Sequence, residues 1–300
     1  MAECITSRHD APSADAILDE VRRIGGGSLH EKVTSALMLR YPLWKGSDSC
    51  LSATPTALID GVANLVAISG KGKGAVAARN ITAGELIIAE ASLVRSRPGS
   101  AAESAVEALG DAERSSFFGL CNGHGERFGS AKTVQAIWLT NAYPIGDGEQ
   151  AIFPVAARMN HACRPVAFHR WDASTQTHRV TATQPIAKGD ELTVCYCKEG
   201  TRDERRAFLQ SAFGFCCSCE ACLLSGAELA QSDVRQQRLQ ALDAQIARAT
   251  ASPCDAGDMV EDMPQLLRML SERVELMELE GVAEAAWARG TMEEFLAELE

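Results

Sequence analysis

The stretch "RMNHACRPVAF", residues 158–168, places an asparagine, a histidine and a cysteine within four consecutive positions and meets a proline soon after. Taken alone, this pattern describes a loop with a buried cysteine. A second stretch about fifty residues later, "FGFCCSCEAC" at residues 213–222, changes the interpretation because it holds three more closely spaced thiols, Cys217, Cys219 and Cys222. Together the two stretches point to a shared site.

The spacing of the cysteines predicts a zinc site. A tetrahedral zinc ion takes four ligands at about 2.3 Å from sulfur, and a single loop can supply most of them. Cys216 is too close to Cys217 in the chain to serve beside it, so Cys163 is the natural fourth ligand. We therefore expect zinc to be bound by Cys163, Cys217, Cys219 and Cys222. The alternative is a set of buried structural thiols.

Length and composition are those of an ordinary globular protein. The chain has 300 residues, of which 46% are hydrophobic and 23% are charged, enough for one large domain with appendages or for two domains. No window holds the roughly 18 apolar residues of a membrane span, and acidic residues interrupt what would be a signal peptide. We expect an intracellular protein, cytoplasmic or nuclear or both, in which eleven cysteines stay reduced and favour metal over disulfides.

Charge is unevenly distributed along the chain. Residues 257–300 carry twelve acidic and three basic side chains, whereas residues 1–256 carry 28 acidic and 26 basic ones. The main body is therefore close to neutral and has no basic field, so we expect no direct binding of nucleic acid. The acidic tail is typical of a solvated helical face rather than of a docking site for basic partners.

Patterning divides the chain into four regions. Residues 1–60 are weakly patterned and form an N-terminal extension, while residues 61–200 alternate short β-favouring runs with glycine turns. Within this part, residues 65–94 predict a meander of strands and residues 99–140 predict a helical insert. After the cysteine-rich segment at 201–222, apolar residues at three- and four-residue spacing predict a helical region over 223–300.

Four motifs in this order resemble SET-domain protein lysine methyltransferases. "NHACRP" is similar to the Asn-His-Ser-Cys motif of that family, and "GDELTVCY", residues 189–196, is similar to its second motif, a turn and strand ending in tyrosine. "GKGKGAVAARNITAGELI", residues 70–87, resembles the first strand pair, and residues 213–222 resemble the post-SET zinc loop. "LTNAYPI", residues 139–145, further resembles the SET-and-MYND subgroup and its fungal relatives.

The resemblance covers residues 61–222 and implies a mostly β fold, with small irregular sheets around a knot-like crossing, a helical insert, a post-SET zinc loop and a helical tail. Three departures stand out. Ala162 replaces the usual serine, and Val166 replaces the usual asparagine after the proline. Only one cysteine, Cys121, lies between Gly74 and Cys163, too few for a MYND finger.

The resemblance also implies S-adenosylmethionine as the methyl donor. Glycines allow close approach of the backbone to a ligand, so Lys71, Gly72 and Lys73 are expected to meet the donor carboxylate; a flexible hairpin tip is the alternative. Asn160 and His161 are expected to bind the adenine and amino-acid parts of the donor.

Aromatic residues supply the rest of the implied site. Phe213 and Phe215 would form a wall over the adenine, with core packing as the alternative. Tyr196 is the catalytic candidate and also borders the donor, and Asn141 and Tyr143 would line the lysine channel. A lysine, with a pKa near ~10.4, must lose its proton before methyl transfer, and an apolar channel favours the neutral amine.

Three functions are consistent with these residues. The first is a protein-lysine methyltransferase acting on a lysine of a histone or another protein. The second is a SET scaffold that binds a partner without catalysis, motivated by Ala162 and Val166. The third is a SET scaffold that acts on a small molecule.

Cys195 and Cys197 flank Tyr196 and are expected to point to the opposite face of its strand.

Overall fold

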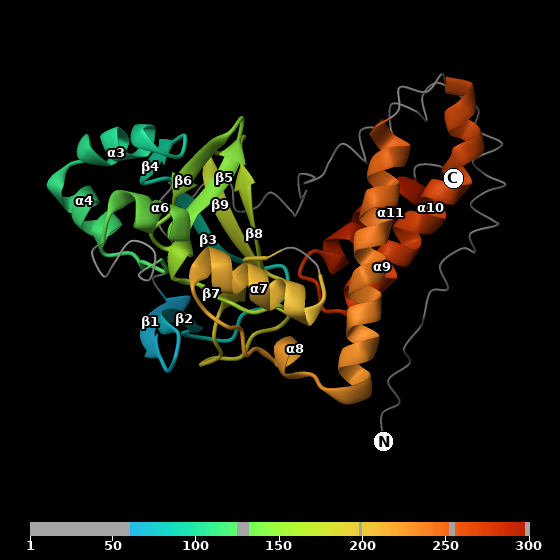
Figure 1. The fold of residues 1–300 in the computed structure, drawn as a ribbon, viewed down its shortest axis with the longest axis horizontal. Helices are drawn as coiled ribbons and strands as arrows, with labels where there is room; N and C mark the ends of the chain where they lie inside the picture. Colours follow the sequence, from blue (N-terminus) through green and yellow to red (C-terminus); the bar gives the residue numbers. More distant parts are fainter. Residues whose placement is uncertain (1–60, 125–131, 198–199, 252–255, 298–300) are drawn as a thin grey trace.

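The computed structural model describes residues 61–124, 132–197, 200–251 and 256–297. The N-terminal extension predicted at residues 1–60 lies outside the described residues. Figure 1 shows the small sheets near the middle of the molecule, with helices at both ends. No helix in the described ranges is long and apolar enough to cross a membrane.

The glycine-rich turn forms a hairpin between β1 (Ala63–Ile68) and β2 (Gly72–Ala77), which pair antiparallel. Gly70 and Gly72 both have a φ of +74°, a conformation that glycine adopts without steric cost. The N–H of Lys71 donates to the carbonyl of Ile68 at 3.0 Å and closes the turn. The hairpin therefore presents Lys71 at its tip.

The next strand departs from the predicted meander. β3 (Leu86–Ala91) pairs with β9 (Thr177–Ala182) rather than with β2, and β9 pairs in turn with β8 (Ala167–Asp172), so the sheet has the order β3-β9-β8. The meander predicted over residues 65–94 is thus correct only for the first hairpin. Buried Ile87 and Ile88 need apolar partners across the sheet, and β9 supplies Val180.

A second three-stranded sheet has the order β4-β6-β5 and is antiparallel throughout. Its strands are β4 (Val94–Ser96), β5 (Ala142–Gly146) and β6 (Glu149–Ile152). The expected small sheets with several helices are confirmed by this arrangement.

A short parallel pair joins two of the motifs identified in the sequence. β7 (Asn160–His161) pairs with β10 (Thr193–Val194), and the N–H of Ala162 extends the pairing by donating to the Val194 carbonyl at 3.1 Å. Parallel strands cannot be joined by a tight turn. This pair therefore fixes the place where "NHAC" meets "ELTVCY".

Helices occupy the insert between β4 and β5. They are α3 (Ser100–Glu107), α4 (Asp111–Phe118) and α6 (Val134–Asn141). Phe117, Ile137 and Trp138 are buried together in one apolar cluster, so the insert has a core of its own. These helices lie at the end of the molecule opposite the C-terminal helices (Figure 1).

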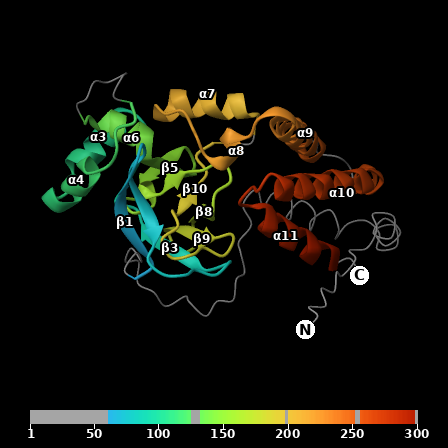
Figure 2. The same cartoon turned by 90° about the horizontal axis from the view of Figure 1, so that it is seen from below.

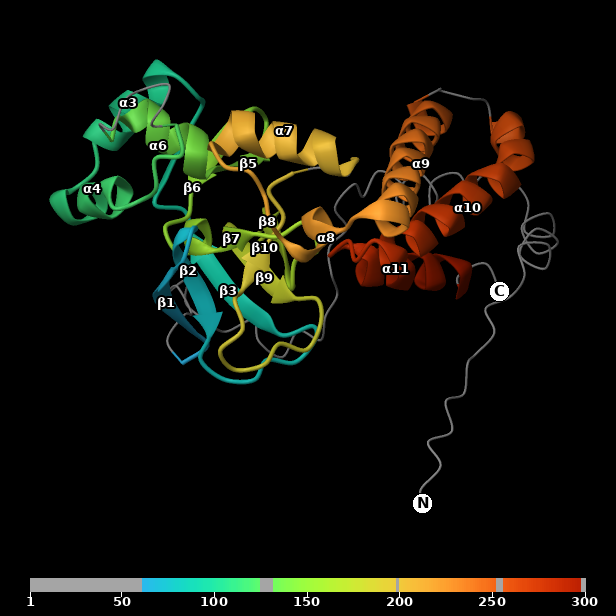
Figure 3. The same ribbon diagram turned by 60° about the horizontal axis from the view of Figure 1, so that its bottom comes forward.

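The C-terminal part is helical, as its periodicity predicts. The predicted helical region over 223–300 contains α9 (Gly226–Ala251), α10 (Ala256–Leu279) and α11 (Ala285–Ala297). The segment predicted as a zinc loop, 201–222, also contains helices that were not predicted, α7 (Arg202–Phe213) and the start of α8 (Glu220–Leu223). Figures 2 and 3 show α9, α10 and α11 gathered together, with α8 between them and the small sheets. Leu239, Met277 and Ala285 form the buried core of this helical group.

A buried carboxylate attaches the helical group to the core. Glu280 is only 3% exposed, and it accepts hydrogen bonds from Ser232 at 2.6 Å and from Arg235 at 2.5 Å. Its backbone carbonyl accepts from the Nε of Arg164 at 2.9 Å. Because Arg164 directly follows Cys163, this clamp ends beside the predicted zinc ligand.

Candidate functional site

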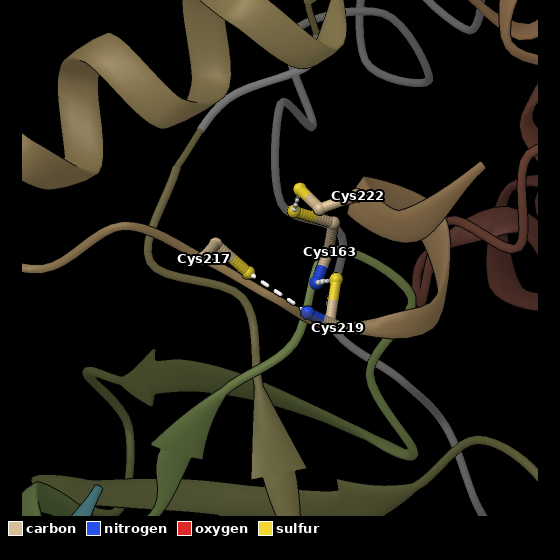
Figure 4. A group of neighbouring side chains, drawn as sticks. All are labelled: Cys163, Cys217, Cys219 and Cys222. Atoms are coloured by element: carbon tan, nitrogen blue, oxygen red, sulfur yellow. Dashed lines mark hydrogen bonds between the residues drawn. The ribbon is translucent and has the colours of Figure 1, made fainter. Parts of the chain in front are cut away.

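The structure brings the four predicted zinc ligands together. The Sγ atoms of Cys163, Cys217, Cys219 and Cys222 all lie within 4.8 Å of one another, and those of Cys163 and Cys222 are 3.6 Å apart. Four sulfurs placed about 2.3 Å from a common tetrahedral centre would be about 3.8 Å apart. Figure 4 shows the side chains gathered from two segments far apart in the sequence. Their arrangement fits a tetrahedral metal ion.

Local structure explains why the second segment reaches the first. α7 ends at Gly214, whose φ of +76° turns the chain, and a Cβ there would lie 2.2 Å from the carbonyl oxygen of Gly123. Arg206 then holds the loop, donating to the carbonyls of Cys217 at 3.1 Å and Cys222 at 2.9 Å. The cysteines thus sit on a loop that is braced from both ends.

Electrostatics also favours a cation among the sulfurs. Hydrogen bonding from Cys163 lowers the pKa of the Cys219 thiol, and the N–H of Cys163 points to the same sulfur at 3.4 Å. Burial opposes the charge of Arg205, yet the sulfurs of Cys163 and Cys222 raise the pKa of its guanidinium. Four thiols this close cannot all ionise without a positive ion. A soft ion such as zinc suits this donor set.

His161 connects the sulfur cluster to the tyrosine segment. Its Nδ1 accepts the N–H of Tyr196 at 3.0 Å, so its Nε2 carries the hydrogen and donates to the Sγ of Cys163 at 3.2 Å. Burial lowers the pKa of His161 to about 4, so the imidazole is neutral near pH 7. Both ring nitrogens of His161 therefore have hydrogen-bond partners within the protein. A contact of His161 with the methyl donor would come from its backbone.

Glu191 is a site residue that the sequence analysis missed. One of its carboxylate oxygens accepts from the Nζ of Lys71 at 2.6 Å, and the other accepts from the Nδ2 of Asn160 at 2.9 Å. A Cβ at Gly74 would lie 2.5 Å from that same Nδ2, so a side chain there would displace the Asn160 amide. Lys73 on β2 is exposed. Glu191 belongs to the quoted "GDEL" segment, and this segment was the sequence signal that could have identified it.

The predicted aromatic residues form a continuous row. The ring of Phe215 is 6.1 Å from that of His161, and the ring of Phe213 is 4.9 Å from that of Tyr196. The two phenylalanine rings are themselves 6.5 Å apart, and they pack in one apolar cluster with Cys217. Their place over an adenine stays a prediction.

The two tyrosines donate to backbone carbonyls of one short segment. The hydroxyl of Tyr196 donates to the carbonyl of Met159, and the hydroxyl of Tyr143 donates to that of Ala156 at 3.3 Å. Burial raises the pKa of both hydroxyls far above the ordinary value, so both are neutral. A hydroxyl that donates in this way keeps its lone pairs to accept a hydrogen from an amine.

Asn141 is used by the protein backbone. Its buried amide donates to the carbonyls of Cys121 at 2.8 Å and Ile137 at 2.7 Å, which ties the end of α6 to the preceding loop. Its role in a lysine channel stays a prediction. The sulfurs of Cys195 and Cys197 lie 3.9 Å apart, in line with the expected alternation.

A comparison with protein families now identifies the core. Residues 72–197 match the model of the SET domain, and this range contains β2 through β10 and the tyrosine that ends the second motif. This part of the chain therefore matches a SET domain. The SET domain thus includes one of the four clustered cysteines, Cys163, and the other three follow it.

Three curated relatives that the chain resembles are named as lysine methyltransferases. The chain is 30% identical over 189 residues to "Histone-lysine N-methyltransferase set5" of Schizosaccharomyces pombe, covering 61% of this chain and 58% of that protein. It is 40% identical over 74 residues to "Protein-lysine N-methyltransferase SMYD4" of Mus musculus, covering 24% and 9%. It is 35% identical over 75 residues to "Histone-lysine N-methyltransferase ATXR2" of Arabidopsis thaliana, covering 24% and 16%.

These matches place the SET domain close to the SET-and-MYND group and its fungal relatives, as its motifs predict. The chain spans less than two thirds of the length of these curated relatives.

Proposed function

We propose that this SET-domain protein is a protein-lysine N-methyltransferase that uses S-adenosylmethionine. The observation that carries the proposal is the parallel pairing of β7 with β10, which brings Asn160, His161 and Tyr196 together beside four clustered thiols. The names of the relatives agree with this activity. The SET domain would span residues 61–200, with a post-SET loop at 201–222 and a helical region at 223–300.

The donor would bind on the side of the hairpin and the aromatic row. Asn160 and the backbone of His161 would hold its nucleoside and amino-acid parts, Lys71 and Lys73 would face its carboxylate, and Phe215 would cover its ring. When bound, S-adenosylmethionine supplies an electrophilic methyl group on a positively charged sulfur. Glu191 already holds Asn160 and Lys71 in one place, so part of this pocket is organised in advance.

The substrate would be a protein that presents a lysine side chain, from a histone or another protein. Tyr196 is buried and neutral, and it would accept an N–H of the lysine amine and aim its lone pair at the methyl group. Tyr143 and Phe213 would line the apolar passage and exclude water. Loss of water lowers the pKa of the lysine and favours the neutral amine that the reaction needs.

Zinc would serve a structural purpose in this enzyme. Cys163, Cys217, Cys219 and Cys222 would hold it, and the ion would close the loop that carries Phe213 and Phe215 against the crossing. His161 would act beyond the ligands by donating to the Cys163 sulfur. The protein would work in the cytoplasm, the nucleus or both, without direct contact to nucleic acid.

Two observations weaken the alternative of a non-catalytic scaffold. That alternative is motivated by Ala162 and Val166, where the family usually carries polar side chains. In the structure both residues contribute backbone N–H groups to the crossing, Ala162 to the carbonyl of Val194 at 3.1 Å and Val166 to the hydroxyl of Thr193 at 3.3 Å. The crossing is therefore held without the usual side chains.

The direct test compares wild type with Tyr196→Phe, using labelled S-adenosylmethionine with histones and with a protein extract. We expect wild type to label a protein on lysine, and Tyr196→Phe to lower the turnover rate about hundredfold while calorimetry shows unchanged donor binding. Cys195→Ser, next to Tyr196 and without an assigned role, is the matched control and should label normally. Donor binding by wild type without any labelled lysine would contradict the proposal for the proteins sampled.

A further inference from the structure

We infer that Glu90, on β3, is a positioning residue that orients both tyrosine hydroxyls through the backbone segment between them. This inference rests on the proposed methyl transfer, because it assigns a role to a residue within that site. Glu90 lies three residues after the motif at 70–87 but far from both tyrosines in the sequence, and its hydrogen bonds are to the backbone of Val155 and Ala156. Its effect would pass through residues 155–159.

The contacts of Glu90 are with the backbone alone. Its side chain is buried, at 5% exposure, and its Oε1 accepts the N–H of Val155 at 2.9 Å. Its Oε2 accepts the same N–H at 3.2 Å and that of Ala156 at 2.9 Å. The carboxylate thus accepts hydrogen bonds from two consecutive N–H groups about 65 positions away in the chain.

These N–H groups begin the short 3₁₀ helix η1 (Ala156–Arg158), which leads directly into β7. The first N–H groups of a helical turn have no partner within the turn and favour a negative charge nearby. Glu90 supplies that charge from β3. It therefore fixes where η1 begins.

The same segment holds the two tyrosines. The carbonyl of Ala156 accepts the hydroxyl of Tyr143, and the carbonyl of Met159 accepts the hydroxyl of Tyr196. The N–H of Met159 donates back to the Ala156 carbonyl at 3.1 Å, so the two acceptors belong to one rigid turn. A shift of η1 would move both hydroxyls together.

The groups that face Glu90 do not neutralise it. Tyr143 on β5 is neutral, since burial first and then the charges of Tyr196 and Glu90 raise the pKa of its hydroxyl. His178 on β9 is the cross-strand partner of Glu90, and burial lowers the pKa of its imidazole well below the usual value. Within the described residues, no ion pair involves Glu90. An isolated buried carboxylate is costly, and backbone N–H groups are its stabilising partners.

Burial raises the pKa of Glu90 to about 7, while its hydrogen bonds with Ala156 and Val155 act in the opposite direction. Protonation takes away part of its accepting capacity. In wild type, turnover should therefore fall as the pH drops through about 7. This acid limb is separate from the deprotonation of the substrate lysine, whose ordinary pKa is near ~10.4.

The test uses Glu90→Gln, which keeps the size of the side chain but replaces one accepting oxygen with an amide that cannot accept. We expect turnover to fall about tenfold to hundredfold with donor affinity unchanged in calorimetry, and the acid limb near pH 7 to disappear. Glu85→Gln is the matched control, because Glu85 precedes the same strand but pairs with Arg79 at the surface. A normal turnover rate with the acid limb retained in Glu90→Gln would overturn the inference.

A second measurement does not depend on activity. The chain has three tyrosines, Tyr41, Tyr143 and Tyr196, so carbon-13 at the ring ζ position gives three NMR signals that Tyr→Phe variants assign. Glu90→Gln should shift the signals of Tyr143 and Tyr196, whereas Glu85→Gln should leave them in place.

Unmoved Tyr143 and Tyr196 signals in Glu90→Gln would overturn the inference, even in a protein that transfers no methyl group. A wild type without activity but with the expected shifts would refute the proposed function alone. If Glu90→Gln does not fold, Glu90→Asp, which keeps the charge on a shorter side chain, should still lower turnover and shift the Tyr143 and Tyr196 signals, and unchanged turnover and signals would overturn the inference.

Discussion

The cysteine cluster and the tyrosine pair are connected through His161, yet they are held in different ways. The thiols crowd together with sulfur atoms within 4.8 Å and need a cation to stay ionised. The tyrosines are held by neutral hydrogen bonds to the backbone of residues 156–159, a turn whose first N–H groups donate to Glu90. One side of the site therefore depends on a metal and the other on buried backbone contacts. Losing a ligand should have larger effects than losing a single hydrogen bond.

The largest effect is expected from Cys163→Ser, which exchanges a soft thiolate for a hydroxyl. Wild type should carry one zinc per chain, and the variant should retain zinc far more weakly, because metal binding and folding of the loop are coupled. Metal analysis of the purified proteins measures this. Cys216→Ser is the matched control, since Cys216 is exposed and lies outside the cluster. Full zinc retention in Cys163→Ser would show that another group is the fourth ligand.

A smaller effect is expected where the cysteine loop leaves α7. Gly214→Ala and Gly70→Ala impose nearly the same backbone strain, since the two φ values are +76° and +74°, and this costs about 1–2 kcal/mol. Only at Gly214 does the added Cβ meet backbone, 2.2 Å from the oxygen of Gly123. In thermal unfolding, the free energy of unfolding of Gly214→Ala should therefore be lower than that of Gly70→Ala by roughly 1–3 kcal/mol. Equal losses of stability in the two variants would contradict this prediction, because they would show that the backbone at Gly123 moves away from the added Cβ without cost.

The smallest of the three effects concerns the clamp between the helical group and the core. Glu280→Gln should destabilise the protein by about 1–3 kcal/mol, because a buried acceptor of several donors loses its charge. Glu278→Gln, at an exposed ion pair with Arg289, should change stability by less than about 1 kcal/mol. Chemical denaturation of both variants measures the difference.

The same clamp predicts a dependence on pH. Burial opposes the charge of Glu280, but hydrogen bonds from Ser232 and Arg235 lower the pKa of its carboxyl. A depressed pKa contributes stability above the unfolded pKa, and this contribution is lost as the pH falls through the folded value. Denaturation at acidic pH should therefore reduce the gap between wild type and Glu280→Gln. A gap that widens in acid would contradict this assignment.

Local patterns were enough to name the residues in short motifs that the fold then brings together. Cys163 and the three later cysteines, Asn160 and Tyr196 could be named from spacing and resemblance, because the chemistry of each is visible in a few residues. The parts that could not be predicted depend on distant pairings. β3 joins β9 rather than β2, and Glu90 reaches residues about 65 positions away.

The roles of His161 and Glu191 show the same limit at the level of single side chains. Sequence reasoning assigned His161 to the donor, but its ring lies between Tyr196 and Cys163. Glu191 was quoted within a motif without a role, because only the folded chain brings it to Lys71 and Asn160. Residue types predict which chemistry is present, whereas long-range packing decides which partner receives it.

The central claim is that the thiol cluster and the donor pocket form one unit around the β7–β10 crossing. Calorimetric titration of S-adenosylmethionine into Cys163→Ser and Cys216→Ser tests it most directly. We predict that Cys216→Ser binds the donor like wild type, and that Cys163→Ser loses binding together with its zinc. Donor binding of wild-type strength in a zinc-free Cys163→Ser protein would contradict the claim.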